Sequence, residues 1–409
     1  MRGFLRTRLA VALFALNVLA ACTVIPAAHP PAGTTIPKPP PFPAPLPPPP
    51  PPTALTLGVR AGPAIETLPL YSGRAAAALR SFIESCPRLT ARNDSSGLTR
   101  TQDWQPACNA ARTWPSGDAA AFFVQSFETA RVGDGSTYVT GYYEPEIAGT
   151  RSAQTGFAVQ VYRLPGDLVR AWPDEVPPEQ RTGTPPLGRI DENGKVVLYY
   201  DRAAIEDGAL AGRGLELAYA ADAVEFFFLQ IQGSGRLIAP DGSVMRIGYA
   251  GQNGREYVGI GSKMRAAGLI GSGPGQYPGS MQGIMAYLRA NPDQGRALMR
   301  QNPSYVFFRE VIGDGPIGAL GVPVRGQASV AADPLFVPLG APLWLSVDRA
   351  EVSGLWVAQD TGGAIKGANR FDSFWGAGPS ARTIAGGMSA RGDALLFLPR
   401  GTLARLGAR

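Results

Sequence analysis

Two aspartates, Asp360 and Asp372, flank a glycine-rich turn near the C-terminal end of the chain. They lie twelve positions apart, and the turn between them carries three glycines and Lys366. Each glycine lowers the helical preference of the segment by about 1 kcal/mol relative to alanine, so the turn cannot lie inside a helix. We therefore expect a strand over 355–358 to end in a tight loop between the two carboxyl groups.

Large aromatic residues surround the second of these acids. Asp372 is preceded by Phe371 and followed by Phe374 and Trp375. A carboxyl group among apolar rings loses hydration, which favours its protonated form. This pattern is typical of a general acid, so we predict that Asp372 is catalytic.

Asp360 and Asp333, which stands in an Ala-Asp-Pro sequence, have a simpler explanation. Aspartates at strand ends in glycine-rich turns usually accept hydrogen bonds from backbone N–H groups and fix the loop. We expect this structural role to be the main one for both residues, with support of the chemistry as the alternative.

The residue types that are missing restrict the chemistry further. The only histidine is His29, in a proline-rich segment before the folded part, which excludes a Ser-His or Cys-His pair and a histidine metal site from that part. The glycine-rich turn also lacks the Gly-Lys-Ser/Thr sequence of a nucleotide-binding loop. Acid chemistry on a neutral polar polymer such as a glycan fits what remains, and both a two-acid glycosidase and a carbohydrate-binding module would satisfy it.

The N-terminal segment has the pattern of an export signal. Three arginines precede a short apolar run, and Leu19-Ala-Ala-Cys22 closes it, which resembles a bacterial lipobox. The resemblance implies a signal peptide over 1–21, lipidation of Cys22 and a location on the periplasmic face of the outer membrane. The alternative is an ordinary signal peptide and a soluble periplasmic protein. The following anchor and linker, 22–61, is rich in proline and favours an extended polyproline II spacer or a disordered linker.

Charge and cysteine content agree with export. The chain of 409 residues has a formal charge of +6, which falls to +3 without residues 1–21. The sequence contains no basic cluster of the kind that binds nucleic acid, so we do not expect nucleic acid as a partner. With Cys22 lipidated, Cys86 and Cys108 can form a disulfide in an oxidising compartment. Two buried free thiols are the alternative.

Helical spacing appears early in the chain and strand patterns dominate its end. Apolar residues at helical spacing predict helices over 75–86 and 118–131, and a strand follows over 137–144. We predict a long apolar strand over 224–232. Short strands from residue 305 onward, separated by Gly, Pro and Asp turns, favour a closed barrel. Polar and aromatic residues at strand ends are candidates for a substrate groove, although core and turn roles explain several of them equally well: Tyr142, Glu144, Gln232, Ser234, Asn253 and Lys366.

Several motifs, in this order, resemble the membrane-bound lytic murein transglycosylase A family. They are Thr140-Gly-Tyr-Tyr-Glu-Pro145, Gln232-Gly-Ser-Gly235, Tyr249-Ala-Gly-Gln-Asn-Gly254, Gln301-Asn-Pro-Ser-Tyr-Val-Phe-Phe308, and Gln359-Asp-Thr-Gly-Gly-Ala-Ile-Lys-Gly367 with Phe371-Asp372. The C-terminal part also resembles the domain named for three aspartates, here Asp333, Asp360 and Asp372.

The resemblance implies a mainly β fold with packing helices. A double-psi β-barrel domain would comprise 62–147 and 303–409, with the three-aspartate domain at about 322–400. A smaller β domain would be inserted at 148–302, and a groove between the two would accept a glycan strand.

The resemblance also implies the reaction and its partners. The bond between N-acetylmuramic acid and N-acetylglucosamine in peptidoglycan would be cleaved by Asp372 alone, first as acid and then as base, while the C6 hydroxyl of the sugar attacks its own C1. The product is a 1,6-anhydro sugar, and no metal or cofactor is needed. Implied partners are peptidoglycan, the membrane through a lipid anchor, and cell-wall synthesis or division proteins. Two alternatives stay open: a murein-binding lipoprotein without activity, and a hydrolase that uses two acids.

Overall fold

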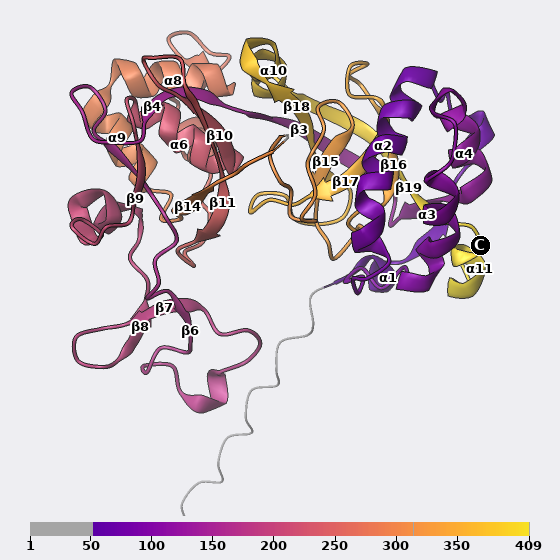
Figure 1. The fold of residues 1–409 in the computed structure, drawn as a ribbon, viewed down its shortest axis with the longest axis horizontal. Coiled ribbons are helices and arrows are strands. Elements are labelled where there is room, and N and C mark those ends of the chain that lie inside the picture. Colours follow the sequence, from indigo (N-terminus) through magenta and orange to yellow (C-terminus); the bar gives the residue numbers. More distant parts are fainter. Residues whose placement is uncertain (1–51, 314, 409) are drawn as a thin grey trace, which may run out of the picture. The chain divides into compact units, whose positions relative to one another are not determined.

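The computed structural model describes residues 52–313 and 315–408 (Figure 1). The predicted signal peptide, the lipidation site Cys22 and most of the linker lie outside the described residues. Within the described part, no helix is both long enough and apolar enough to cross a membrane.

The main sheet closes on itself. Its strands follow the order β1-β2-β19-β16-β17-β15-β18-β3, and β19 also pairs with β3, so that six strands form a ring. Three of the strands come from the N-terminal part and five from the C-terminal part of the chain: β1 (Val59–Ala61), β2 (Phe127–Val132), β3 (Ser136–Glu144), β15 (Ser329–Ala332), β16 (Pro342–Val347), β17 (Gly354–Asp360), β18 (Arg370–Ala377) and β19 (Ser389–Pro399). The ring therefore joins residues more than 200 positions apart.

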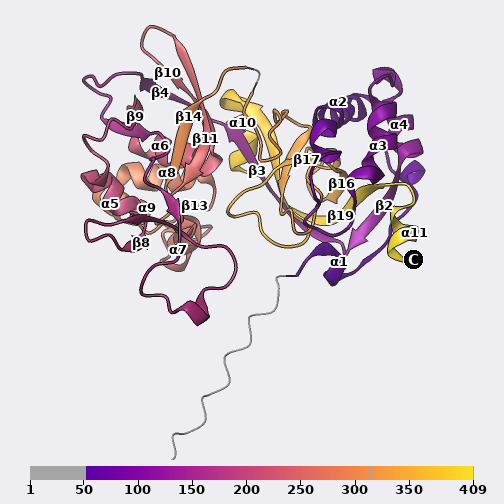
Figure 2. The same ribbon diagram turned by 60° about the horizontal axis from the view of Figure 1, so that its bottom comes forward.

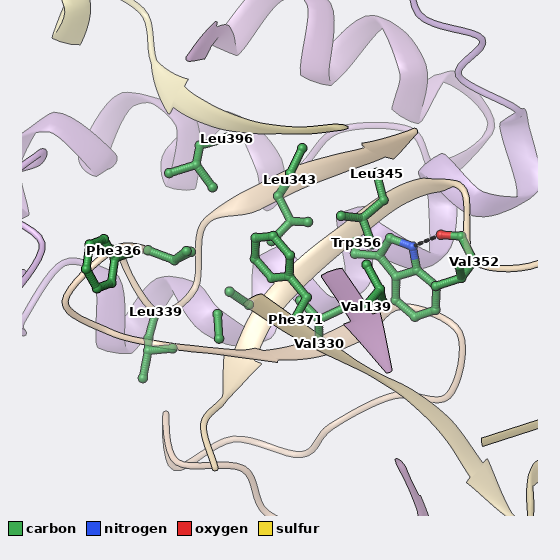
Figure 3. Packing of buried hydrophobic residues seen from close by; sticks show 14 of the residues in the cluster. Val139, Val330, Phe336, Leu339, Leu343, Leu345, Val352, Trp356, Phe371 and Leu396 are labelled. Atoms are coloured by element: carbon green, nitrogen blue, oxygen red, sulfur yellow. Dashed lines mark hydrogen bonds between the residues drawn. The ribbon is translucent and has the colours of Figure 1, made fainter. Parts of the chain in front are cut away.

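The interior of this six-stranded barrel is a dense apolar core (Figure 3). Val139, Val330, Leu343, Phe371 and Leu396 reach into it from five different strands. The indole Nε1 of Trp356 donates a hydrogen bond to the carbonyl of Val352 at 2.8 Å, so the one polar atom of this ring is satisfied.

Helices cover one side of the barrel (Figure 1). The apolar faces of α2 (Ser72–Leu89), α3 (Gln105–Ala111) and α4 (Ala119–Ser126) pack against side chains of β16, β17 and β19. A disulfide joins Cys86 of α2 to Cys108 of α3. The short helices α1 (Ala54–Leu57) and α11 (Thr402–Leu406) lie near the two ends of the described chain, and α10 (Gly378–Gly386) contacts β3 and β18.

The chain between β3 and β15 forms a second sheet. Its order is β14-β11-β10-β4-β9-β5, and Figure 2 shows β10, β11 and β14 side by side. The strands are β4 (Glu146–Thr150), β5 (Val159–Tyr162), β9 (Glu216–Ala220), β10 (Ser234–Ile238), β11 (Val244–Gln252) and β14 (Val306–Glu310). The accompanying helices are α5 (Arg202–Ala204), α6 (Ala223–Gln232), α7 (Ile260–Ala266), α8 (Met281–Ala290) and α9 (Pro292–Arg300). Two small sheets complete this part: β6 (Val169–Arg170), β7 (Leu187–Ile190) and β8 (Val196–Leu198), and β12 (Ile270–Gly271) with β13 (Tyr277–Pro278).

The chain is thus a mixed α/β protein with a six-stranded barrel and a second sheet. The prediction of a β-barrel with packing helices is confirmed at this coarser level, while the double-psi connectivity, the groove and the domain boundaries stay predictions. The predicted strand over 224–232 is wrong because this segment is the helix α6. The predicted helix over 118–131 ends at Ser126, and β2 begins at the next residue.

Candidate active site

The barrel register brings Asp360 and Asp372 to one face of three neighbouring strands. Ala331 of the central strand β15 pairs with Asp360 of β17 on one side and with Asp372 of β18 on the other. Residues directly opposite one another across neighbouring strands share a face of the sheet. With strands about 4.8 Å apart, the two aspartates are separated by roughly 10 Å at the backbone.

Asp372 points away from the barrel core because side chains alternate along β18. Phe371, its neighbour, lies in the core (Figure 3), whereas Asp372 keeps partial contact with solvent. On its own side, Phe374 packs with Tyr142, Val324, Ala331 and Ile365 in a small apolar cluster. Only one of the three predicted aromatic neighbours therefore shares the face of the acid, since Trp375 also belongs to the barrel core.

The carboxyl group of Asp372 has one firm hydrogen-bond donor. Thr140 lies directly opposite on β3, and its hydroxyl donates to Oδ1 of Asp372 at 2.7 Å. The same hydroxyl oxygen accepts a hydrogen bond from Nη2 of Arg370 at 2.8 Å. Burial raises the pKa of Asp372 to about 6, the Thr140 hydrogen bond and the Arg370 charge oppose this rise, and the charge of Asp360 adds to it.

Asp360 is held by three donors. Its Oδ1 accepts from the backbone N–H groups of Ala319 at 2.8 Å and Thr361 at 2.9 Å. Its Oδ2 accepts from the Tyr142 hydroxyl at 3.0 Å. Burial raises the pKa of Asp360, and the hydrogen bonds from these three groups oppose the rise. The side chain therefore fixes the loop after β17 and positions Tyr142.

Asp333 organises the glycine-rich turn. It is buried, and its Oδ2 accepts from the N–H of Gly367 at 2.9 Å, while Oδ1 accepts from Leu335 at 3.1 Å. Gly367 has a φ of 94°, a region that favours glycine. The turn exposes Lys366, which makes no ion pair with any described residue.

The remaining groove candidates fall into two groups. Gln232, at the end of α6, accepts a hydrogen bond from the N–H of Tyr143 at 2.9 Å and so lies next to β3, and Ser234 is buried at the start of β10. Glu144 and Asn253 instead hold the structure together. The Glu144 carboxylate, 1% exposed, pairs with two arginines. The buried amide of Asn253 donates to two backbone carbonyls and accepts from the N–H of Tyr305, which leaves it no free donor for a substrate.

Sequence reasoning missed Thr140, Arg370 and Tyr257. Tyr257 lies near Asp372, whose charge adds to the burial that raises the pKa of this phenol. Thr140 is the first residue of the motif that ends at Pro145, but its contact with Asp372 depends on the parallel pairing of β3 with β18 across 232 positions. No local spacing rule reveals such a pairing.

The titratable groups near Asp372 in the described part of the chain are Asp360, Tyr142, Tyr257 and Arg370. Among the described residues, no group of three or more His, Cys, Asp and Glu side chains could hold a metal ion. The carboxyl group of Asp372, with its raised pKa, is able to donate and accept a proton.

The chain is similar to known proteins along most of its own length. The family model of the MltA specific insert domain matches residues 138–309, and that of the 3D domain matches residues 328–398. The membrane-bound lytic murein transglycosylase A of Escherichia coli K12 is 31% identical over 329 residues, which cover 78% of this chain and 80% of the relative.

Solved structures agree with these matches. A membrane-bound lytic murein transglycosylase from Agrobacterium tumefaciens is 28% identical with a TM-score of 0.72, covering 85% of this chain and 99% of its own. The E. coli MltA structure with bound chitohexaose is 26% identical with a TM-score of 0.59, covering 83% and 94%. The chain belongs to the membrane-bound lytic murein transglycosylase A family.

Proposed function

We propose that the protein is a lytic transglycosylase of peptidoglycan. It cleaves the β-1,4 bond between N-acetylmuramic acid and N-acetylglucosamine and leaves a 1,6-anhydro end. The observation that carries this proposal is the carboxyl group of Asp372, whose pKa is raised to about 6 by burial while one of its oxygens is held by Thr140. The relatives named above are lytic murein transglycosylases, and one of them binds a chitin oligosaccharide.

In the first step Asp372 acts as an acid. Because Oδ1 accepts from Thr140, the proton of the neutral carboxyl group belongs on Oδ2, the oxygen without a donor. This proton passes to the glycosidic oxygen as the bond from that oxygen to C1 breaks. A pKa near 6 leaves a useful fraction of the group protonated in weakly acidic to neutral solution.

In the second step the carboxylate acts as a base. It takes the proton of the C6 hydroxyl as that oxygen attacks C1 of the same sugar, so Asp372 ends protonated and no water is consumed. The donor Thr140 and the charge of Arg370 stabilise the carboxylate between the two steps. Attack within one sugar ring gains from proximity, worth about 7–11 kcal/mol in favourable cases.

The second acid supports the site without a direct part in the reaction. Asp360 already accepts three hydrogen bonds, so it is poorly placed to activate water. Its remaining contributions are the position of Tyr142 and a negative charge that raises the pKa of Asp372.

The glycan would lie in a groove between the double-psi barrel, 62–147 with 303–409, and the inserted domain, 148–302. The side chains that would contact the glycan are those of Tyr142, Gln232, Tyr257 and Lys366. Ser234 would contact the glycan through its backbone groups at the start of β10. Glu144 and Asn253 would act only by holding the surrounding chain.

A lipid on Cys22 would tether the enzyme to the periplasmic face of the outer membrane, where it reaches murein through the proline-rich linker. The relatives are named membrane-bound, which supports this location. Cell-wall synthesis or division proteins are the partners that such a position suggests.

The test is the activity of Asp372→Asn on isolated murein sacculi, read by mass spectrometry of the released muropeptides. We expect anhydro products from the wild type and none from the variant, because the amide group of Asn is too weak an acid to protonate the glycosidic oxygen. Asp393→Asn, an exposed site on β19, is the matched control and should retain activity. Substantial anhydro product from Asp372→Asn refutes the assignment.

The same experiment distinguishes the lytic transglycosylase from a hydrolase that uses both aspartates. A two-acid hydrolase adds water and yields reducing ends, whose mass exceeds that of the anhydro products by one water. A scaffold without activity would bind sacculi and release neither product.

A further inference from the structure

Two arginines and a tyrosine form a row on the outer face of the barrel, next to Asp372. In the sheet, β3 pairs with β18 on one side and with β19 on the other. Tyr138 of β3 lies opposite Arg370 of β18 and opposite Arg391 of β19, and these three residues are the arginine row. Asp372 follows Arg370 by two positions, so it shares this face and lies roughly 7 Å further along the strand.

Both guanidinium groups of the arginine row pack on the ring of Tyr138. Their central carbon atoms lie 4.9 Å (Arg370) and 4.7 Å (Arg391) from the ring centroid, which is within the range of a cation–π contact. Arg370 is half-buried and also donates to neutral oxygens. These are the hydroxyl of Thr140 and the carbonyl groups of Tyr138 and Phe371.

The cation of Arg391 has no counter-ion in the described part of the chain. Its side chain is exposed and, apart from the contact with the ring, makes no hydrogen bond or ion pair with a described residue. Arg370 likewise forms no ion pair with a described residue, because all of its acceptors are neutral. Two cations therefore share one aromatic ring without a bound carboxylate.

The acids near the arginine row each have another role. The charge of Asp372 acts on Arg370 when that carboxyl group is ionised, but the group is neutral at the start of the proposed reaction. Asp348 accepts from the backbone N–H of Arg391 at 2.9 Å and not from its guanidinium group. Asp393 pairs with another arginine at 2.9 Å. An anion placed at the row would therefore relieve the repulsion between its two cations.

The arginine row is ordered before any ligand binds. An exposed ion pair usually contributes little, because its formation immobilises two long and flexible side chains. Here the ring of Tyr138 already holds both guanidinium groups. The fork of N–H groups on an arginine also matches the two oxygens of a carboxylate. The row is therefore suited to a carboxylate on a ligand that is bound at Asp372.

We propose that the arginine row binds a carboxylate of the peptide stem on the N-acetylmuramic acid beside Asp372. This proposal rests on the proposed function. The stem leaves the sugar at its lactyl group, and its first free carboxylate belongs to its second residue. Two extended residues span about 7 Å, which matches the separation between the row and Asp372. The enzyme therefore prefers glycan with acidic stems to glycan whose stems are neutral.

An anionic membrane surface is the competing partner, because the enzyme is proposed to be tethered to a membrane. Segments that bind anionic lipids typically carry clusters of about four to eight basic residues. The arginine row has two, and they lie in register with the acid of the proposed reaction. A single carboxylate next to the reacting sugar matches this arrangement better than an extended charged surface does.

The test measures kcat/KM for anhydro product on three substrates with the intact protein. They are glycan strands with acidic peptide stems, the same strands after amidation of the stem carboxylates, and strands freed of their stems by an amidase. We expect the wild type to be about fivefold faster on acidic than on amidated stems, which is the upper range for an exposed ion pair.

Arg391→Gln should remove most of this preference. Arg391 takes no part in the proton transfer, so its rates on amidated and stem-free strands should stay at the wild-type level. Arg80→Gln, at an exposed position of α2, is the matched control and should keep the preference. Arg391→Glu, with its fold checked by circular dichroism, should reverse the preference, because a carboxylate at this position repels the acidic stem.

Each other outcome overturns the stem site. Equal wild-type rates on acidic and amidated stems do so and leave the proposed function intact. An equal loss on all three substrates in Arg391→Gln does so as well, because the arginine then only supports the barrel. Binding to vesicles of anionic phospholipid that requires Arg391, with an unchanged stem preference in the variant, assigns the row to the membrane instead. Absence of anhydro product from every substrate overturns the proposed function and the stem site together.

Discussion

The hydroxyl of Thr140 connects the charges of the site. It donates to Oδ1 of Asp372 and accepts from Arg370, so it transmits the influence of the cation to the acid without direct contact between them. Such an arrangement lowers the pKa of Asp372 only in part, because burial remains the larger effect. The pKa of Asp372 therefore stays in the range in which one carboxyl group can both donate and accept a proton.

Thr140→Val tests this role. Loss of the donor removes a contact that favours the carboxylate, so the pKa of Asp372 should rise above about 6. Since Asp372 must start protonated, activity falls as the pH rises through this pKa, and the fall should move to higher pH by about one unit, the scale of a hydrogen bond to a charged group. The pH profile of kcat/KM on murein measures the shift. Thr140→Ser keeps the hydroxyl and should keep the wild-type profile, whereas an unshifted profile for Val would show that the contact does not tune the acid.

Asp372 should also reduce stability at neutral pH. Its folded pKa of about 6 lies above the reference value of 3.8, so stability is highest below 3.8, falls as the pH rises towards 6, and stays reduced above that. The group keeps some solvent contact, so we expect Asp372→Asn to be more stable than the wild type by about 1–3 kcal/mol at pH 7.

Urea unfolding at pH 4 and pH 7 measures this difference in the free energy of unfolding. The gain should shrink strongly at pH 4, where the wild-type carboxyl group is largely neutral in the folded state. A variant that is less stable than the wild type at pH 7 would show that the hydrogen bond to the carboxylate outweighs its burial.

At the scale of elements, strong local signals in the sequence identified α2 and β3, whereas an apolar run that was interpreted as a strand accounts for the largest error. The segment 223–232 has helix-capping signals at both ends, with Asp222 accepting from the N–H groups of Val224 and Glu225, and Gly233 in the left-handed region. Its Phe-Phe-Phe-Leu run is buried on most sides, so no polar face reveals a helical period.

Asp360 and Asp372 could be selected from residue type and spacing, and their roles stay predictions, whereas the residues that contact them could not be found in this way. Asp372 was selected because of its residue type and its aromatic neighbours, of which only Phe374 lies on the same face of the sheet, in a small apolar cluster. The strand β18 that carries it was not predicted, since its pairing partners β3 and β15 are fixed only when the barrel closes. Glu144 and Asn253 are polar residues whose burial depends on contacts far along the chain.

The disulfide between α2 and α3 should matter for stability more than for chemistry. It closes a loop of 22 positions and anchors helices that pack on the barrel. A loop of this size predicts that Cys86→Ala with Cys108→Ala lowers the free energy of unfolding by about 3 kcal/mol. Urea unfolding with and without reductant measures this. Reductant should weaken the wild type to a similar degree and leave the double variant unchanged; a wild type insensitive to full reduction would contradict the estimate.

At the scale of the whole molecule, one ion cluster joins the segments that run between the two sheets. Pro145 separates β3 of the barrel from β4 of the second sheet, and Glu144 lies at this passage. Its carboxylate pairs with Arg236 of β10 and Arg246 of β11, each at 2.9 Å. Arg246 also donates to the carbonyl of Gly313, on the segment that returns from β14 towards the barrel. The two segments that connect the barrel with the second sheet therefore both bind to arginines of β10 and β11.

Glu144→Gln should weaken this connection. The amide keeps the shape of the side chain, but it replaces a buried charge that two arginines need and turns an N–H group towards one of them. Removing one member of a buried ion cluster costs about 3–5 kcal/mol, and the partial exposure of the arginines, 29% and 20%, lowers our expectation to about 2–3 kcal/mol. Urea unfolding gives the free energy, with Glu146→Gln as the control, because Glu146 pairs with Arg236 at the surface and should cost less than about 1 kcal/mol. Equal losses in the two variants would mean that burial of Glu144 adds nothing, and that the two sheets are joined by the apolar contacts around them instead.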